Sequence, residues 1–163
     1  MKTLIVLIMS LLFTHIVFGQ QELPDSGFTN KAEAKNLTVN GLKEGKWVEY
    51  FVNSGNANYP FYQLTYYHLG KPYGIVRNYY SDGIIYYEVP YKDGKRNGLG
   101  KEYDYKGAVV REAPYKDDKE NGVERYYQNG ILRREIIYSN DSAKSTTMYN
   151  QYLDDRDERR YPR

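Results

Sequence analysis

Few side chains in this sequence could carry covalent or metal chemistry. Cysteine is absent, and the only two histidines are His15 and His68. A base-activated nucleophile or a histidine-based zinc site in the mature chain would have to use His68, and no nucleophile motif or second ligand accompanies it. We interpret His68 as an exposed linker residue at the end of a strand.

Carboxylates are numerous but carry no local catalytic signature. The acidic run near the C-terminus alternates with arginines and lacks the glycine turn of an EF-hand calcium loop, which favours solvated salt bridges. A glycosidase pair would need two carboxylates, but a repetitive chain supplies them at many positions. We therefore predict a protein that is not an enzyme and that uses no cofactor or metal. The glutamates considered are Glu49, Glu88, Glu102, Glu112, Glu124 and Glu135.

Tyrosine is the residue type with a functional alternative, because the chain contains 20 of them. Several occur in adjacent pairs, and strand alternation sends one member of each pair to either face. An outward row of tyrosines would suit a protein partner or stacking on sugar rings, although it is also compatible with ordinary strand surface. The predicted interaction surface consists of Tyr66, Tyr80, Tyr86 and Tyr126.

The N-terminus has the features of a secretory signal peptide. Lys2 precedes the apolar stretch Leu4 to Leu12, and Val17-Phe18-Gly19 offers a cleavage site. The alternative is a membrane anchor, but the segment Leu4 to Phe18 spans 15 residues, short of the roughly 20 apolar residues that a bilayer requires. We predict a signal peptide over 1–19, cleaved after Gly19, and a periplasmic or secreted protein.

Charge excludes several classes of partner. The formal net charge is +2 and the basic and acidic residues are interleaved, whereas nucleic-acid binders concentrate basic residues on one face. We expect no nucleic-acid partner and at most peripheral contact with a membrane. Without cysteine, stability must come from burial and backbone pairing.

A repeat of about 24 residues governs the middle of the chain. The spacing is 24 and 24 in one glycine series, 24 and 23 in a second, and 24, 24 and 23 in a tyrosine series. An earlier copy begins at Gly45, 29 residues before Gly74, and has a longer loop around Asn53 to Phe61. Such periods mark repeat arrays. The three series are Gly74, Gly98 and Gly122; Gly83, Gly107 and Gly130; and Tyr67, Tyr91, Tyr115 and Tyr138.

The sequence of each repeat predicts a β-hairpin. Gly74 to Tyr80 and Ile84 to Tyr91 are short, rich in Ile, Val and Tyr, and separated by Asp82-Gly83, a dipeptide that supplies two positive φ angles to a tight turn. Alternation places Ile75, Arg77 and Tyr79 on one side and Val76, Asn78 and Tyr80 on the other. The predicted core is Trp47, Tyr50, Ile75, Tyr79, Ile85, Tyr87, Tyr91, Leu99, Tyr103, Val109, Tyr115, Val123, Tyr127, Leu132 and Tyr138.

The repeats lie between two segments of different composition. Residues 20–40 contain few large apolar side chains and predict a flexible leader, and 41–138 form the hairpin repeats. Residues 139–163 predict a cap, with Met148 to Leu153 as a closing strand or short helix, followed by a charged tail. Pro90 and Pro114 are expected to end the second strand of their hairpins, because proline donates no ladder hydrogen bond.

The recurring phrases resemble a known repeat family. GKWVEYF, GIVRNYYSDG, GKEYDYKG and GVERYYQNG, linked by YKDGKRNG and YKDDKENG, are similar to the MORN-repeat variant of antitoxin-component-like bacterial repeat proteins. The resemblance implies an all-β fold, an open elongated array of tandem hairpins that forms one twisted sheet. It also implies a scaffold for contact with proteins or membranes.

These observations together predict an exported, non-enzymatic repeat scaffold that mediates protein-protein interaction. The alternative is carbohydrate or cell-wall binding through the outward tyrosines. An export signal does not suit the neutralisation of a cytoplasmic toxin, so the resemblance to antitoxin-component-like proteins carries no functional expectation.

Overall fold

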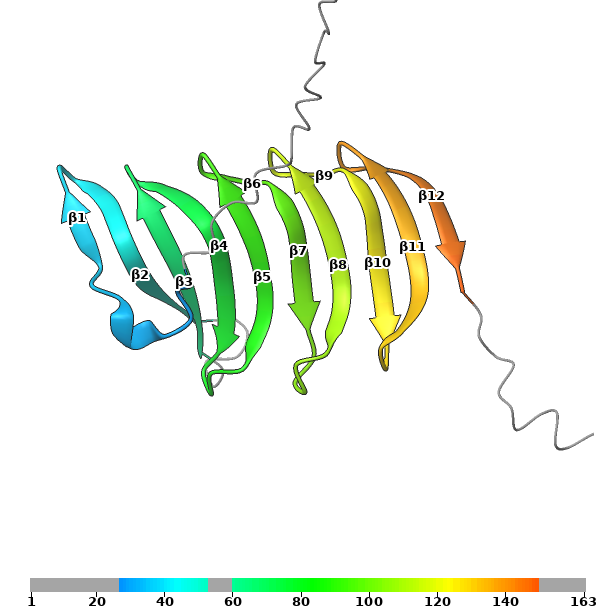
Figure 1. The fold of residues 1–163 in the computed structure, drawn as a ribbon, viewed down its shortest axis with the longest axis horizontal. Helices are drawn as coiled ribbons and strands as arrows, with labels where there is room; N and C mark the ends of the chain where they lie inside the picture. The colour runs from blue at the N-terminus through cyan, green and yellow to red at the C-terminus, as the bar shows by residue number, and fades with distance from the viewer. Residues whose placement is uncertain (1–26, 53–59, 150–163) are drawn as a thin grey trace, which may run out of the picture.

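A single open antiparallel sheet makes up the computed structural model, which describes residues 27–52 and 60–149 (Figure 1). The sheet has 12 strands, and the order of its long strands follows the chain, while the short strands β6 and β9 pair only with β5 and β8. The predicted all-β array of tandem hairpins is confirmed. The elements are η1 (Lys31–Glu33), β1 (Leu37–Val39), β2 (Leu42–Val52), β3 (Pro60–His68), β4 (Lys71–Tyr80), β5 (Ile85–Lys92), β6 (Lys95–Arg96), β7 (Gly98–Tyr103), β8 (Val109–Lys116), β9 (Lys119–Glu120), β10 (Gly122–Gln128), β11 (Ile131–Ser139) and β12 (Ser142–Met148).

Two-residue turns line one edge of the sheet, along the top in Figure 1. Both turn residues have positive φ, as in type I′ turns, for example 53° at Asp93 and 83° at Gly94. This conformation matches the twist of the flanking strands and favours Gly, Asn and Asp. The turns are at residues 40–41, 69–70, 93–94, 117–118 and 140–141.

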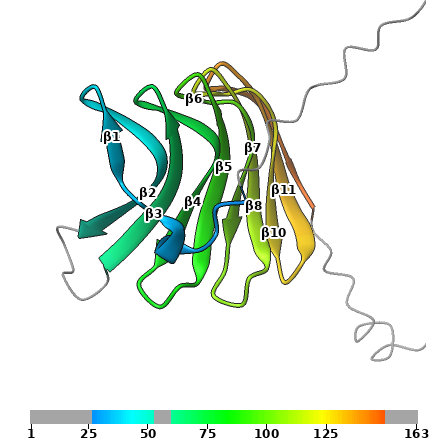
Figure 2. The same cartoon turned by 60° about the vertical axis from the view of Figure 1, so that its left-hand side comes forward.

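Neighbouring turns at this edge are joined by a backbone hydrogen bond that follows one rule. The N–H of the second turn residue donates to the carbonyl two residues after the previous turn. The donor-acceptor distances lie between 2.9 and 3.2 Å. The turns therefore stack in register, as the view in Figure 2 shows. The bonds are Gly70 to Lys43, Gly94 to Pro72, Asp118 to Arg96 and Asp141 to Glu120.

The turns at the opposite edge differ from the sequence prediction. Gly83 has positive φ but Asp82 does not, and the Gly83 N–H bonds to Tyr80 O while Tyr80 N–H bonds to Ile84 O. The loop thus has three residues and ends in a left-handed glycine, the next most common hairpin connection. The loop 105–107 is built in the same way. Asn129-Gly130 does have two positive φ angles.

Two small cores lie on opposite faces of the sheet. Phe28, Tyr62, Leu64 and Tyr79 form one, and Val89, Ala113 and Tyr115 form the other. Tyr79 and Tyr115 were predicted as core residues and are buried. The prediction was wrong for Tyr50, which is 65% exposed, and Leu99, which is 39% exposed, because a single-layer sheet leaves much of both faces open to solvent.

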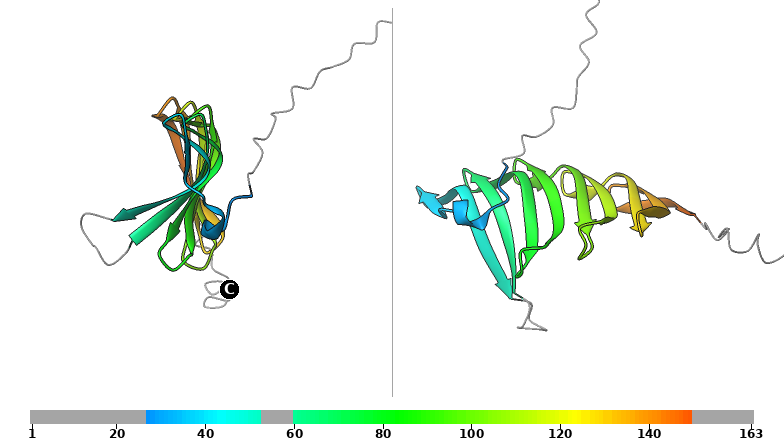
Figure 3. Two further views of the ribbon diagram at one scale, coloured as in Figure 1. Left: turned by 90° about the vertical axis from the view of Figure 1, so that its left-hand side faces the viewer. Right: turned by 60° about the horizontal axis from the view of Figure 1, so that its bottom comes forward.

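A flexible leader was predicted over 20–40, but the described part of this segment, from residue 27, contains regular structure. Residues 31–33 form η1, capped by the Asn30 side chain, and residues 37–39 form β1. Phe28 is 1% exposed, so this segment is held against the sheet by burial of a large apolar ring. In the left view of Figure 3, η1 lies on one side of the sheet. The predicted signal peptide falls outside the described residues.

At the other end, the polar strand β12 follows the last repeat and ends at Met148. Most of the closing strand or short helix predicted over Met148 to Leu153 lies outside the described residues, which end at residue 149. Pairing with β11 explains how such a polar segment becomes a strand. The charged tail lies outside the described residues.

The prolines do not end their strands. β5 continues past Pro90 to Lys92, and β8 continues past Pro114 to Lys116. Their carbonyls accept hydrogen bonds from Asn97 and Asn121, where the facing strand is interrupted. No helix among the described residues has the length and apolarity needed to cross a membrane.

Candidate functional site

Strand register assigns the tyrosines predicted to interact to the two faces of the sheet. Tyr80 pairs with Phe61, and Tyr126 lies in the same row as Arg111, on the face that we call the groove face. Tyr86 lies there too, because its ring is 4.8 Å from that of Tyr80. Tyr66 pairs with Lys46 on the opposite face, which we call the leader face because it carries Phe28. The structure thus brings together Tyr80 and Tyr86, sets Tyr126 further along, and separates Tyr66.

The groove face is hollowed between two successive repeats. The groove has a volume of about 520 Å³. Residues of strands β4 to β8 line it, including Arg96 from the short β6. Aromatic rings and two guanidinium groups dominate its wall. Its lining residues are Tyr80, Tyr86, Tyr87, Arg96, Glu102, Tyr103, Val110, Arg111 and Tyr115.

An aromatic cluster forms one side of this groove. The rings of Tyr80 and Tyr105 stack with centroids 4.5 Å apart and an interplanar angle of 14°. Phe61 contacts Tyr80 and Tyr86 at 5.8 and 5.5 Å. Burial raises the pKa of Tyr86, with the nearby Tyr80 adding to the shift. Tyr105, from the loop between β7 and β8, is 56% exposed and extends the cluster toward solvent.

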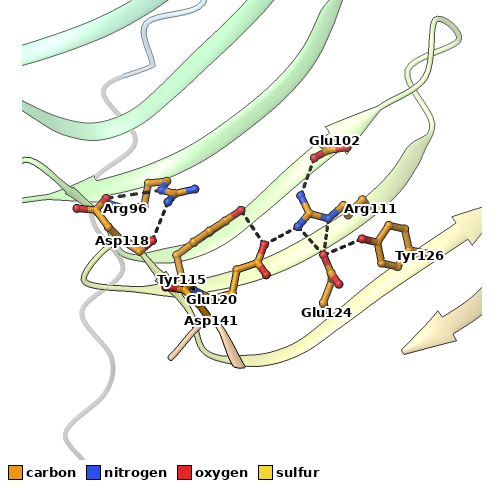
Figure 4. A network of polar contacts seen from close by, with 9 residues as sticks. All are labelled: Arg96, Glu102, Arg111, Tyr115, Asp118, Glu120, Glu124, Tyr126 and Asp141. Atoms are coloured by element: carbon orange, nitrogen blue, oxygen red, sulfur yellow. Dashed lines mark hydrogen bonds and ion pairs between the residues drawn. The ribbon is translucent and has the colours of Figure 1, made fainter. Parts of the chain in front are cut away.

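Arg111 organises the floor of the groove (Figure 4). Its guanidinium binds Glu102 at 2.7 Å and Glu120 at 2.6 Å, and it also pairs with Glu124. Burial works against the charged form, but the carboxylates outweigh it and raise the pKa of Arg111. Tyr126 donates its hydroxyl to Glu124 at 3.0 Å. The arginine is therefore fixed in a rigid polar network.

Glu124 is the most deeply buried member of that network. Its side chain is 1% exposed, and one carboxylate oxygen, Oε2, has no hydrogen-bond partner among the described residues. Its other oxygen accepts from both Arg111 and Tyr126. A buried carboxylate is tolerated only with such compensation, so Glu124 holds Arg111 in place.

Arg96 occupies the end of the groove nearest the two-residue turns. Its guanidinium lies 4.2 Å from the ring centroid of Tyr115, a cation–π contact, and bonds to Asp118 O at 2.7 Å. Tyr115 in turn donates its hydroxyl to Glu120 at 3.3 Å. The groove thus presents a stacked arginine, an ion-paired arginine and several tyrosines.

The groove offers binding groups and no recognisable catalytic constellation among the described residues. His68, predicted to be an exposed linker residue, is the last residue of β3, its side chain is 63% exposed, and its Nδ1 lies 3.0 Å from Glu44. Hydrogen bonds from His68 and from the Leu69 amide lower the pKa of Glu44. Within the described ranges, no three His, Asp or Glu side chains group in a way that would hold a metal.

Sequence reasoning missed Arg96, Tyr105 and Arg111, and it considered Glu102 only as a catalytic carboxylate. The repeat period contained a signal for Arg111, which stands 24 residues after Tyr87 and 23 before Arg134. Tyr87 was assigned to the core, so the repeat places a charged residue at the equivalent core position. The other three required the pairing of β5 with β7, which no local pattern specifies.

Comparison with known proteins identifies the repeat. The model of the MORN repeat variant matches residues 72–93, 96–117 and 120–140. No curated protein matches the chain. The match concerns the repeat and does not extend to the antitoxin-component-like family that the sequence resembles. Such repeats are typical of proteins involved in binding. Three consecutive segments between residues 72 and 140 are therefore similar to MORN repeats of the variant form.

Proposed function

We propose that this protein is an exported, non-enzymatic module that binds a protein partner through the groove face. The observation that carries the proposal is the groove itself, in which tyrosines from successive repeats surround Arg96 and Arg111. Tyrosine and arginine are enriched at the centres of protein interfaces. The ion pairs of Arg111 fix its position in advance, which lowers the entropic cost of binding.

The arrangement of the rings favours a protein over a sugar. Tyr80 stacks on Tyr105 and is flanked by Tyr86 and Phe61, so its ring is engaged by aromatic neighbours. A sugar-binding platform needs ring faces that are open to the ligand. The cluster instead supplies a continuous apolar surface beside two arginines.

The proposal is tested by site-specific photo-crosslinking in the native cell envelope. A photo-reactive residue at Tyr105 on the groove face should capture a protein other than this one. The same residue at Lys95, an exposed position at the edge with two-residue turns, is the matched control. Equal products from both positions, or none from Tyr105, would contradict the proposal.

A glycan and peptidoglycan binding screen tests the alternative. Tyr80→Ala removes a groove tyrosine, whereas Tyr127→Ala removes one from the leader face, where its hydroxyl bonds to Glu112 at 2.8 Å. We expect no glycan binding by either variant or by the unmodified protein. Glycan binding that is lost in Tyr80→Ala and kept in Tyr127→Ala would replace the protein-binding proposal by carbohydrate binding.

A further inference from the structure

A row of alternating charges crosses the leader face. Register places one residue from each of six consecutive strands of the main order side by side, so that basic and acidic residues alternate. Each repeat contributes one basic residue from its first strand and one glutamate from its second. The row, in order, is Arg77, Glu88, Lys101, Glu112, Arg125 and Glu135, and we call it the charged row.

The charged row is ordered by contacts within the sheet. Arg77 Nε lies 3.2 Å from Glu88, and Arg125 Nε lies 2.9 Å from Glu135. Tyr103 donates its hydroxyl to Glu88 at 2.7 Å. These contacts hold the side chains in fixed positions while part of the row stays accessible, since the Arg125 side chain is 39% exposed.

An apolar row runs beside the charged row on the same face. It includes residues that remain open to solvent, notably Leu99 at 39% and Ile137 at 46% exposure. A continuous band of apolar surface next to ordered charges is a feature of interaction surfaces. The row consists of Ile75, Pro90, Leu99, Pro114, Val123 and Ile137.

The chain itself covers only one end of the leader face. Phe28 packs against Tyr62, Leu64 and Tyr79, and Arg77 Nη1 donates to its carbonyl at 3.4 Å. Beyond β4, no other described segment lies over this face. Among the described residues, nothing covers the middle of the charged row, in which the exposed fraction of the side chain is 19% at Glu88 and 39% at Arg125.

The order of charges makes the row complementary to itself. A row of even length that alternates in sign presents the opposite sign at every position when a second copy faces it in reverse order. A two-fold axis parallel to the strands and between two sheets gives this arrangement, with Lys101 opposite Glu112 and Glu88 opposite Arg125. The same axis places the apolar rows against each other, with Leu99 opposite Pro114.

We propose that two copies of this chain associate face to face through the leader face, with the charged rows antiparallel. A shift by one strand would place like charges opposite one another, and a shift by two strands would leave fewer opposite pairs, so the unshifted alignment pairs the most charges. The pairs are partly exposed, so association weakens as salt is raised. The interface lies on the opposite side of the sheet from the groove and is independent of the proposed binding function.

Charge reversal tests this arrangement by complementation between chains. Lys101→Glu alone and Glu112→Lys alone each place like charges opposite one another at both symmetric contacts, and each should weaken self-association by at least about tenfold. Mixed together, the two variants place opposite charges at both contacts and should form a heterodimer. Sedimentation velocity of each variant, of the mixture and of the unmodified protein measures this.

The controls separate association from folding. Lys106→Glu reverses a charge in an exposed loop outside the row and should leave the dimer unchanged. Circular dichroism confirms that each variant is folded, and if a row variant does not fold, Leu99→Asn serves as a second test that should also weaken the dimer. A monomeric unmodified protein, single variants that still dimerise, or a mixture that stays monomeric would each overturn the proposal.

Discussion

Asp118 occupies a backbone conformation that glycine holds in the neighbouring repeat. Its φ is 71°, and the equivalent residue of the preceding turn is Gly94, at 83°. Aspartate tolerates this left-handed region better than most residues but still costs energy there. Its side chain compensates, because Oδ1 accepts a hydrogen bond from the Arg96 N–H at 2.9 Å. Asp141 makes the same bond to the Glu120 N–H at 2.7 Å.

Replacing Asp118 should therefore give results that depend on the new residue. Asp118→Ala loses the hydrogen bond and keeps the unfavourable φ, which should lower the free energy of unfolding by about 1–2 kcal/mol. Asp118→Gly also loses the bond but relieves the backbone, and should remain within about 0.5 kcal/mol of the unmodified protein. Urea denaturation compares the two. Equal losses in both variants would show that the backbone conformation carries no cost.

At this scale, the sequence predicted which residues form turns better than it predicted their geometry. Asp93-Gly94 and Asn129-Gly130 have a pair of positive φ angles, whereas Asp82-Gly83, for which two were predicted, has one. The dipeptide is compatible with both turn types, and the difference arises from the length of the loop that the strand register leaves. Register depends on pairing between strands and is not encoded in two residues.

The segment before β1 packs on the first repeat because one residue of that repeat differs from its equivalents in the later repeats. Leu64 pairs with Arg77 and occupies the position that Glu88, Glu112 and Glu135 hold in later repeats. With leucine there, the site is apolar and accepts the ring of Phe28. The later glutamates instead accept hydrogen bonds from tyrosines, such as Tyr103 to Glu88. Only the first repeat can therefore hold this segment.

Phe28→Ala should detach the segment and weaken the first repeats. The buried ring is worth about 3 kcal/mol by analogy with other phenylalanine truncations. Because each repeat contacts mainly its neighbours, the loss should be local. Hydrogen exchange should rise in β2 to β4 and change little in β8 to β11, with Thr29→Ala, an exposed neighbour, as the control. A uniform rise over all strands would mean that the array unfolds as one unit.

This element was not predictable from its own composition. Residues 20–40 have few large apolar side chains, a composition typical of segments that do not fold alone. The buried residues that surround Phe28, namely Tyr62, Leu64 and Tyr79, lie 34 or more residues further along the chain, and only the stacked sheet brings them together. The groove had the same limitation, since it needs tyrosines and arginines from two repeats.

For the whole molecule, the buried tyrosines predict a loss of stability in alkali. Burial raises the pKa of Tyr67, Tyr87 and Tyr103, and hydrogen bonds to carboxylates add to the shift at Tyr67 and Tyr103. Their neutral forms are favoured in the folded state, so their contribution is fully present below the unfolded pKa of about 10 and is lost as pH rises above it.

Chemical denaturation at increasing pH measures this effect. The denaturation midpoint should be nearly constant from pH 8 to about 9.5 and should fall above about pH 10, in step with the ultraviolet absorbance of tyrosinate. Tyr87→Phe cannot ionise and should lose less stability over the same interval. A midpoint that stays constant while tyrosinate forms would indicate that the tyrosines ionise without unfolding.

The stacked turns make the length of the sheet depend on the number of repeats. Their hydrogen bonds follow the same two-residue rule although the turns are 29, 24, 24 and 23 residues apart, so differences in repeat length are absorbed by the strands and loops away from this edge. Each additional repeat advances the array by two strand spacings, or roughly 10 Å. The span of the sheet is therefore a count of repeats. Duplicating a 24-residue unit should extend it by one such step without disturbing the rest.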